Sequence, residues 1–399
     1  MDKMEKFLIN RIDEMKDKII KFHQKIIQIP SENPPGKYKE ISKFVENKMR
    51  NIGLTTKIIR NNVIGKLGYE NGPSLILYSH IDTVPASVGW TKKPFGGEII
   101  KNKIYGRGAC DDKACVTASI FAIKAIIDSG IKLKGTVILT SVIDEESGGF
   151  KGINYLLNKE IIKGDVCLLG DGRGNYPAAY FGGCIVITFH IEKKQINIKN
   201  SSNIPKNENP IQKMTTVLNF LNELQEEFNK IESKYPNYPS HHHNTSILLL
   251  SKIQGGEKID NLPKRCTLYC VIYTIPEQDV SSIKSRILRF VGDLNRENPT
   301  LNIRVQIPVS FEPYIADNNS KFAKIVKKSA INVFNEEREF KFFIKPTDSH
   351  YFTEKGIETI SFGNGNIRNN LHAPDEFVAI DDLINTTKMF ASVILNYSV

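Results

Sequence analysis

The hydrophobic positions in the first part of the chain alternate between helical spacing and short, nearly continuous runs. Apolar side chains recur every three to four residues over 3–29, which predicts one long helix, and further helices are expected over about 37–52 and 114–127. The short runs have the length of strands and are typical of strands buried on both faces of a mixed or parallel sheet. Strands that alternate with helices indicate an α/β fold. The clearest strand runs are 74–78, 136–140 and 166–169.

The pattern changes after about residue 182, where the expected elements follow the order strand, helix, strand, strand, helix, strand. That order is the split βαβ pattern of a ferredoxin-like sandwich. Residues 312–399 then return to the alternating style of the N-terminal part. We therefore expect one α/β domain built from 1–182 and 312–399, with 183–311 inserted as an α+β domain. The elements expected in the insertion are 184–191, 210–231, 245–253, 266–275, 279–294 and 302–308.

The composition is typical of a folded protein inside the cell. The chain has 399 residues, of which 40% are hydrophobic and 9% aromatic, so disorder is not indicated. No apolar stretch reaches the ~18 residues that a membrane span needs, and the N-terminus lacks the apolar core of a signal peptide. The six cysteines show no Cys-x-x-Cys spacing, so reduced thiols are expected. These features predict a cytoplasmic location and no membrane partner.

The net charge of +10 makes nucleic-acid binding a class to consider. The lysines, however, are scattered along the predicted helices and do not cluster with aromatic side chains. Such a distribution is more typical of a solvated surface than of a nucleic-acid interface. We therefore expect no nucleic-acid partner.

Several short segments place a histidine or a carboxylate after a predicted strand or before a predicted helix. Functional groups gather at the carboxyl ends of strands in α/β sheets, so these side chains are expected in one crevice. Their imidazoles and carboxylates form the inventory for two divalent cations that share a bridging carboxylate, with one carboxylate left as general base and one as an orienting group. The pattern therefore favours hydrolysis by an activated water. The residues are His80, Asp82, Asp111, Glu145, Glu146, Asp171 and His372.

Each of these segments, taken alone, also has a plain structural interpretation. The His-x-Asp pair could be only a structural pair, the two aspartates before the helix at 114–127 could cap it, and the aspartate between two glycines could mark a turn. Glu145 and Glu146 are more suggestive because two adjacent carboxylates near a buried strand repel each other unless a metal ion or a proton separates them. The joint occurrence of the segments favours a metal site.

Four motifs extend the pattern beyond single residues. They are Ser-His-Ile-Asp-Thr-Val-Pro at 79–85, Tyr-Gly-Arg-Gly-Ala-Cys-Asp-Asp-Lys at 105–113, the Asp-Glu-Glu segment within 140–148, and His-Ala-Pro-Asp-Glu at 372–376. With these motifs the chain resembles the M20 metallopeptidase family, which includes acetylornithine deacetylase, succinyl-diaminopimelate desuccinylase, aminoacylase-1 and carboxypeptidase G2-type enzymes. The resemblance covers nearly the whole chain, with weaker similarity at 255–256, 261–263, 347–348 and 363–365.

The resemblance implies a mixed-sheet zinc-peptidase domain whose insertion is a ferredoxin-like lid and dimerisation domain, and hence a homodimer. It implies two Zn²⁺ ions, with Co²⁺ or Mn²⁺ as alternatives. Glu145 would be the general base that passes a water proton to the leaving amine, and Asp82 would orient His80. The implied ligands are Asp111 as the bridge, His80 and Asp171 for one ion, and Glu146 and His372 for the other.

Two positions in the insertion depart from the family pattern. Asn200 stands where members carry a histidine for the tetrahedral oxyanion, and Tyr273 stands where they carry an arginine for a substrate carboxylate. Asparagine lacks the charge of an imidazolium, and tyrosine lacks the bidentate geometry of arginine. Asn261 and Gly365 are further candidates for substrate or oxyanion contacts. The three histidines at 241–243 are expected in an exposed loop, with one of them as an alternative source of the missing imidazole.

The sequence therefore predicts a di-zinc amidohydrolase that cleaves a small N-acyl amino acid, of the deacetylase or desuccinylase type. A dipeptidase or carboxypeptidase acting on a small peptide is the alternative among hydrolases, because the metal ligands do not determine specificity. A metal-binding pseudoenzyme is the alternative from another class, because Asn200 and Tyr273 replace residues that would contact the substrate.

Overall fold

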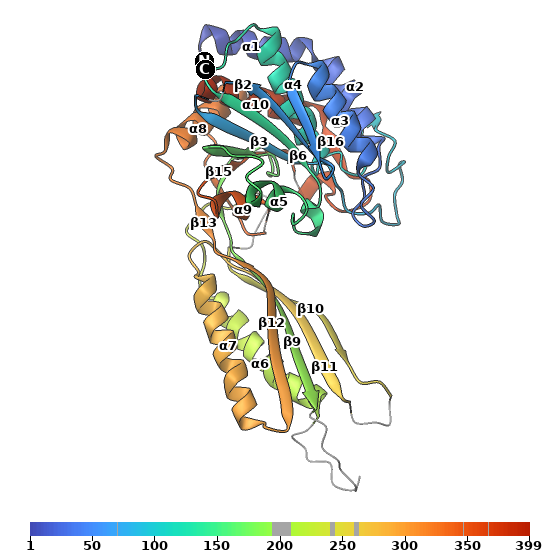
Figure 1. The fold of residues 1–399 in the computed structure, drawn as a ribbon, viewed down its shortest axis with the longest axis vertical. Helices are drawn as coiled ribbons and strands as arrows, with labels where there is room; N and C mark the ends of the chain where they lie inside the picture. The colour runs from blue at the N-terminus through green and yellow to red at the C-terminus, as the bar shows by residue number, and fades with distance from the viewer. Residues whose placement is uncertain (70, 194–208, 240–243, 259–262, 346, 366) are drawn as a thin grey trace.

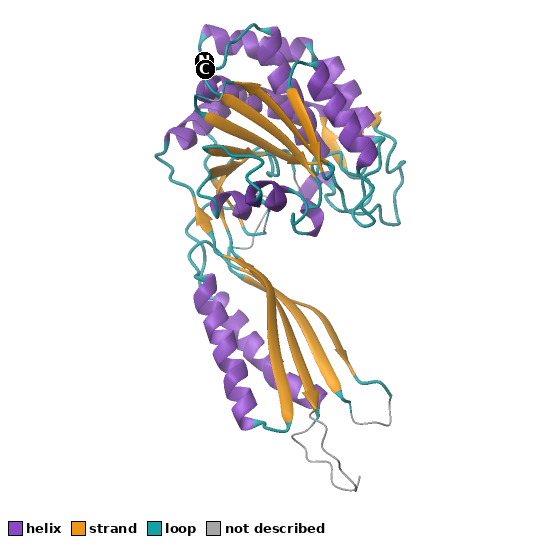
Figure 2. Ribbon diagram, viewed as in Figure 1, coloured by secondary structure: helices purple, strands orange, loops and turns teal. Residues whose placement is uncertain are grey.

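Two bodies make up the computed structural model, which describes residues 1–399 except 70, 194–208, 240–243, 259–262, 346 and 366 (Figure 1). The upper body contains a nine-stranded sheet between helices, and the lower body contains a four-stranded sheet with helices along one side (Figure 2). Both chain termini lie in the upper body. No helix in the described part of the chain is long and apolar enough to cross a membrane.

The central strands of the large sheet run parallel and are buried on both faces. β3 (Ser74–His80) lies between β6 (Thr136–Val142) and β7 (Val166–Leu169) and is parallel to both. Leu75 and Ile76, which are adjacent in β3, belong to hydrophobic cores on opposite faces. Burial on both faces explains the nearly continuous apolar runs in the sequence. The strand order is β1-β2-β6-β3-β7-β15-β8-β13, and β14 also pairs with β8.

Helices cover the two faces of this sheet, which confirms the predicted α/β class (Figure 1). α4 (Lys113–Asp128) and α10 (Ile380–Ser398) pack together over one face, whereas α5 (Ile153–Asn158) and α9 (Ser349–Thr353) pack over the other. The other elements of this body are α1 (Lys3–Glu14), α2 (Lys16–Ile27), α3 (Lys39–Asn51), α8 (Lys321–Phe334), β1 (Thr55–Ile59), β2 (Asn62–Gly68), β8 (Ala178–Phe181), β13 (Tyr314–Ile315), β14 (Lys341–Phe343) and β15 (Glu358–Ser361).

The single helix predicted over 3–29 is two helices, which meet at Met15. The backbone N–H of Met15 donates to the carbonyl of Ile12 at 3.0 Å, a tighter turn that ends α1. The apolar face continues across the break, with Ile12, Met15 and Ile19 all buried in one core. Periodicity alone could not reveal the break because the apolar spacing continues through it.

The lower body is one antiparallel sheet with two helices. The chain enters this sheet at Cys184 and leaves it at Phe311, and the strand order is β10-β11-β9-β12. This order and the sequence of elements are those of a ferredoxin-like sandwich. Alternate residues of β9, such as Ile187 and Phe189, pack with the helices in a separate hydrophobic core. The elements are β9 (Cys184–Lys193), α6 (Pro210–Phe228), β10 (Ile247–Gly255), β11 (Arg265–Tyr273), α7 (Val280–Glu297) and β12 (Leu301–Phe311).

A small sheet that the hydrophobic pattern did not predict joins the C-terminal segment to the loop before α4. Its strands are β4 (Glu98–Ile100), β5 (Lys103–Tyr105) and β16 (Phe377–Ala379), and β5 pairs with both others. Strands of three residues are too short to show an alternating pattern. The sheet brings the motif that begins at His372 next to the motif that contains Asp111, although the two lie far apart in the sequence.

Candidate metal centre

The carboxylate of Asp111 lies between two imidazoles from different parts of the chain. Its Oδ1 is 3.1 Å from Nε2 of His80, which ends β3, and its Oδ2 is 3.3 Å from Nε2 of His372. One carboxylate therefore contacts both histidines of the predicted ligand set, each through its own oxygen. This is the arrangement that a bridging carboxylate requires.

A second carboxylate, that of Glu146, approaches His372. Glu146 lies in a short 3₁₀ turn, Glu145–Ser147, directly after β6, and its Oε2 is 3.3 Å from Nε2 of His372. Ligand atoms of Asp111, Glu146 and His372 all lie within 4.8 Å of one another. Carboxylate oxygens and imidazole nitrogens form a donor set that suits Zn²⁺, Co²⁺ and Mn²⁺. The residues at this position therefore fit a divalent cation.

Asp171 approaches Asp111 from the end of β7. It lines a small recess together with Asp111, Asp112 and Gly365. Burial and the charge of Asp111 raise the pKa of Asp171 to about 6. A second cation held by Asp171, Asp111 and His80 would relieve the repulsion between these two carboxylates.

The clustered carboxylates demand compensating positive charge. Hydrogen bonds to Asp111 and Glu146 raise the pKa of His372 to about 10. Burial lowers the pKa of His80, yet its hydrogen bonds to Asp111 and Asp82 outweigh that effect and raise this pKa well above the usual range. Protons on these imidazoles and metal ions are therefore competitors for the same acidic site, so metal affinity should fall as the pH falls.

Asp82 links the first histidine to the turn that follows β6. Its carboxylate accepts the backbone N–H groups of Glu145 at 3.3 Å and Glu146 at 3.2 Å, and also the amide of Asn33 at 3.1 Å. The closest partner of Nδ1 of His80 is the backbone carbonyl of Asp82, at 3.0 Å, whereas the carboxylate oxygen lies at 3.5 Å. Asp82 therefore positions the imidazole and both glutamates together.

Glu145 is the carboxylate of the cluster best placed to handle a proton. Its Oε2 is 4.0 Å from Nε2 of His80, and it lines the cavity described below. Burial raises the pKa of Glu145 well above the usual range for a carboxyl group. A raised pKa makes a carboxylate a stronger base, which is what transfer of a proton from water requires.

Glu376, the last residue of the motif at 372–376, has a role that the sequence did not indicate. Its buried carboxylate accepts the backbone N–H groups of Gly108 at 3.2 Å, Cys110 at 3.0 Å and Asp111 at 3.1 Å. Nη1 of Arg107 lies 2.6 Å away and forms a buried ion pair with it. Glu376 thereby fixes the loop that carries Asp111. This role is visible only in the folded chain, where the carboxylate of Glu376 is buried beside that loop.

A cavity of about 450 Å³ opens between the metal centre and the lower sheet. The predicted residues Asp111, Glu145 and His372 line its floor, and Tyr273 lines the opposite wall. The backbone N–H of Gly365 donates to the carbonyl of Gly172 at 3.2 Å, so it is already engaged within the fold. Asn200, Asn261 and the histidines at 241–243 lie outside the described residues.

His350 is an imidazole in this cavity that the sequence did not single out. Its Nδ1 is 2.9 Å from the carbonyl of Thr347, and because a carbonyl only accepts, Nδ1 carries the proton. Burial lowers the pKa of His350 to about 4, so the ring is neutral at pH 7 and Nε2 is an acceptor. The ring also stacks on Phe311, with centroids 3.9 Å apart. In this state His350 cannot donate a hydrogen bond to an oxyanion.

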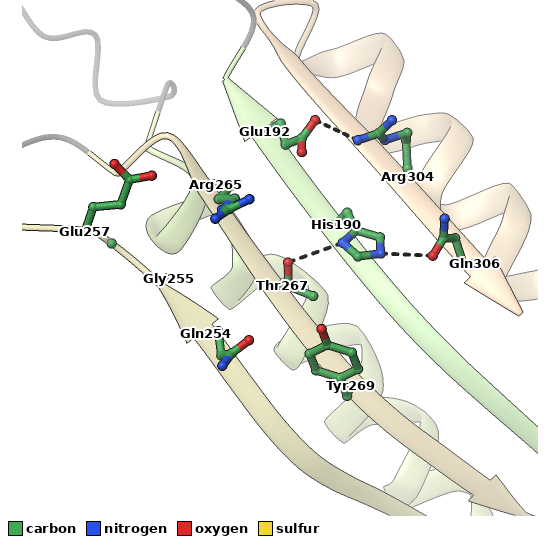
Figure 3. A pocket seen from close by; sticks show the side chains of 11 residues that line it. His190, Glu192, Gln254, Gly255, Glu257, Arg265, Thr267, Tyr269, Arg304 and Gln306 are labelled. Carbon is green, nitrogen blue, oxygen red and sulfur yellow. Dashed lines mark hydrogen bonds and ion pairs between the residues drawn. The ribbon is translucent and has the colours of Figure 1, made fainter. Parts of the chain in front are cut away.

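A second, polar cavity of about 610 Å³ lies on the open face of the lower sheet (Figure 3). His190 lines this cavity, and Thr267 and Gln306 are each 3.2 Å from one of its ring nitrogens. Arg304 and Glu192 form an ion pair of 2.6 Å at one side. None of the predicted metal ligands lines this cavity.

The model of peptidase family M20/M25/M40 matches residues 76–396. Among curated relatives, an uncharacterized metallohydrolase of Methanocaldococcus jannaschii is 26% identical over 95% of this chain and 99% of its own length. The N-formyl-4-amino-5-aminomethyl-2-methylpyrimidine deformylase of Halalkalibacterium halodurans is 23% identical over 98% and 96%, respectively. The succinyl-diaminopimelate desuccinylase of Pelagibacter ubique is 26% identical over 94% and 97%.

Solved structures share the fold over the full chain. Human carnosine dipeptidase 1 superimposes with a TM-score of 0.74 and 16% identity, covering 99% of each chain. A metallo-carboxypeptidase of Sulfolobus solfataricus gives a TM-score of 0.74 and 19% identity, covering 100% of this chain and 99% of its own. These similarities extend through both bodies.

The role of Glu376 can be tested with the variant Glu376→Gln. An amide keeps the shape but removes the charge, leaving Arg107 buried without its ion-pair partner, so the free energy of unfolding should fall by about 3 kcal/mol. Zn²⁺ should also bind more weakly, because the Asp111 loop loses its anchor. Thermal unfolding and equilibrium dialysis measure the two effects. The control Glu40→Gln, at an exposed position of α3, should change neither the free energy of unfolding nor the affinity for Zn²⁺. If Glu376→Gln also changed neither, Glu376 would not anchor the Asp111 loop.

Proposed function

Because this chain belongs to peptidase family M20/M25/M40, we propose that it hydrolyses the amide bond of a small N-acyl amino acid, as a deacetylase or desuccinylase does. Members of the family are metal-dependent hydrolases of C–N bonds, which confirms the predicted enzyme class. The observation that supports the proposal most directly is the Asp111 carboxylate between two imidazoles, with the raised pKa of Glu145 beside it. This arrangement joins cation ligands to a base in one cavity.

The residues divide into ligands and groups that act on the substrate. The proposed holders of two Zn²⁺ ions, with Co²⁺ or Mn²⁺ as alternatives, are Asp111 as bridge, His80 with Asp171, and Glu146 with His372. Bound cations at this position supply Lewis acidity, which polarises an amide carbonyl and lowers the pKa of water. Asp82 keeps His80 and the backbone of the glutamate turn in place.

Glu145 carries the proton through the reaction. Its carboxylate accepts a proton from the attacking water, which makes the water a better nucleophile for the amide carbonyl. The protonated Glu145 then donates to the amide nitrogen, so that the nitrogen leaves as a neutral amine. Burial favours the first step, because it stabilises the protonated, uncharged form of the carboxyl group that results from it.

A dipeptidase or carboxypeptidase activity is the second candidate. Relatives named as a deformylase and a desuccinylase act on acyl amides, whereas two structural neighbours are named as a dipeptidase and a carboxypeptidase. A metal-binding pseudoenzyme is the third candidate because of Asn200 and Tyr273, and the complete ligand set with Glu145 speaks against it. A location in the cytoplasm belongs to the proposal, and the six free, buried cysteines support it.

A homodimer through the lower body is also part of the proposal. β10 is an edge strand, and its exposed residues include Leu249, Leu250 and Ile253, which are 48%, 39% and 53% exposed. An exposed edge with apolar side chains is a template for pairing with another strand. Pairing of β10 with β10 of a second copy would cover these side chains and satisfy the free backbone groups.

The general base can be tested with Glu145→Ala. Turnover of N-acetyl and N-succinyl amino acids should fall by about 10²–10⁴-fold, because no other group replaces the base. Zn²⁺ content, measured by emission spectrometry, should equal that of the unaltered protein. Glu160→Ala, which changes an exposed glutamate, should keep full activity. Retained turnover in Glu145→Ala would refute the mechanism.

The substrate class can be tested with a panel of N-acetyl, N-succinyl and N-formyl amino acids and dipeptides, each with added Zn²⁺, Co²⁺ or Mn²⁺. We expect turnover of acyl amino acids to exceed that of dipeptides, and removal of metal with a chelator to abolish it. Faster cleavage of dipeptides would favour the second candidate. Binding without turnover across the whole panel would favour the pseudoenzyme.

The dimer can be tested by sedimentation of the double variant Leu249→Lys, Ile253→Lys. Charged side chains on the edge strand oppose pairing with another edge, so the variant should sediment as a monomer and the unaltered protein as a dimer. Leu288→Lys, at a 51% exposed leucine of α7, is the matched control and should leave the dimer intact. A dimer that survives the double variant would place the interface elsewhere.

A further inference from the structure

The open face of the lower sheet changes character along its length. In β9 the residues on this face are Cys184 and Val186 near the upper body, then Thr188, His190 and Glu192. The far half is the polar cavity of Figure 3, as expected for a sheet face that meets water. The near half is apolar although it lines an open cavity.

The apolar half consists of two rows that cross three strands. Val186 pairs with Val271 on one side and Val309 on the other, and Cys184 pairs with Tyr273 and Phe311. All of these residues line the cavity above the metal centre. Because side chains alternate between the faces of a strand, the neighbouring residues of β9 pack in the core beneath the helices and cannot form this wall.

The upper body adds further apolar surface to the same cavity. Phe150, a residue that is 52% exposed, lines it next to Tyr351, whose ring centroid is 6.5 Å from that of Phe150. Phe343 lines the cavity as well. Apolar walls on both sides of a cavity that holds a few polar groups are typical of a site for a ligand with an apolar group.

Two cationic side chains, Arg173 and Lys345, line the cavity besides the imidazole of His372. The guanidinium of Arg173 lies over the ring of Phe343, 5.0 Å from its centroid, and Lys345 is exposed. Within the described part of the chain, neither forms an ion pair of 4.0 Å or less. Arg173 follows Asp171 by two residues and also lines the recess beside Asp111, so it lies close to the metal centre.

Arg173 and Lys345 lie where a substrate carboxylate would need a cation beside it. Asp111, Glu145 and Asp348 line the same cavity, so a substrate carboxylate that does not itself reach a bound metal ion is stabilised only by a cationic side chain beside it. Tyr273, which lines the wall, cannot supply that cation. An arginine binds a carboxylate through two parallel N–H groups and is therefore the stronger candidate of the two cations.

Resting on the proposed function, we infer that the cavity selects amides that carry a free carboxylate and a bulky apolar group. Arg173, assisted by Lys345, binds the carboxylate. The valine row at Val186, Val271 and Val309 contacts the apolar group. The preferred substrates are therefore N-acylated apolar or aromatic amino acids, and substrates with charged side chains fit the apolar wall poorly.

The carboxylate contact is tested by calorimetric binding to Glu145→Ala protein loaded with Zn²⁺, which binds without turnover. The probes are N-acetyl-L-phenylalanine and its carboxamide, N-acetyl-L-phenylalaninamide. Adding Arg173→Gln should weaken binding of the carboxylate about 10–100-fold and leave binding of the carboxamide unchanged. Arg289→Gln, an exposed arginine of α7, is the matched control and should change neither. Equal loss for both probes would show that Arg173 only balances the metal centre and would overturn the inference.

The apolar contact is tested with Val186→Thr, which keeps the shape of the side chain and adds a hydroxyl. The preference for N-acetyl-L-phenylalanine over N-acetylglycine should fall by up to about tenfold. An unchanged preference would refute the role of the valine row. Binding that depends on Arg173 without turnover in the unaltered protein would contradict the proposed function but not this inference. Turnover that does not depend on Arg173 would contradict this inference but not the proposed function.

Discussion

The partly buried carboxylate of Asp111 is the constraint around which the upper body is organised. Its two oxygens contact His80 and His372, so the end of a central strand and a loop near the C-terminus must meet at one point. Glu376 fixes the backbone at Asp111 from the C-terminal side, and the Arg107 guanidinium compensates its charge. The buried charge of Glu376 is tolerated only because the Arg107 guanidinium and backbone N–H groups compensate it. The small sheet that aligns the two motifs is therefore needed for the geometry of the site as well as for the fold.

The second constraint is the repulsion among the remaining carboxylates. Asp171 and Asp348 have pKa values raised to about 6 and about 7, and in both cases burial is the largest cause. The hydroxyl of Tyr78, which lies two residues before His80 in β3, donates to Asp348 at 2.5 Å. Cations in the cluster would relieve this repulsion, which links metal binding to the stability of the whole cavity floor.

The open face of the lower sheet has an apolar half, which lines the cavity above the metal centre, and a polar half farther out. Near the upper body, the row at Val186 faces the cavity above the metal centre, and farther out His190 and its neighbours form a polar surface (Figure 3). The upper body thus supplies the reactive groups, whereas the wall that contacts the rest of the substrate comes from an insertion with its own hydrophobic core. Changes in that wall can alter specificity without disturbing the ligands.

The sequence by itself determined the α/β class, the order of the long elements and the residues that the structure gathers around Asp111, because buried strands and reactive side chains leave strong local patterns. It assigned no role to Glu376, Arg173 or His350. The helix break at Met15 was also missed, because the apolar spacing continues across it. The three-residue strands were missed because they are too short to show an alternating pattern. Only the tertiary structure decided which carboxylate anchors the Asp111 loop and which cation shares the cavity. These roles arise from burial and from contacts between segments that are distant in the chain.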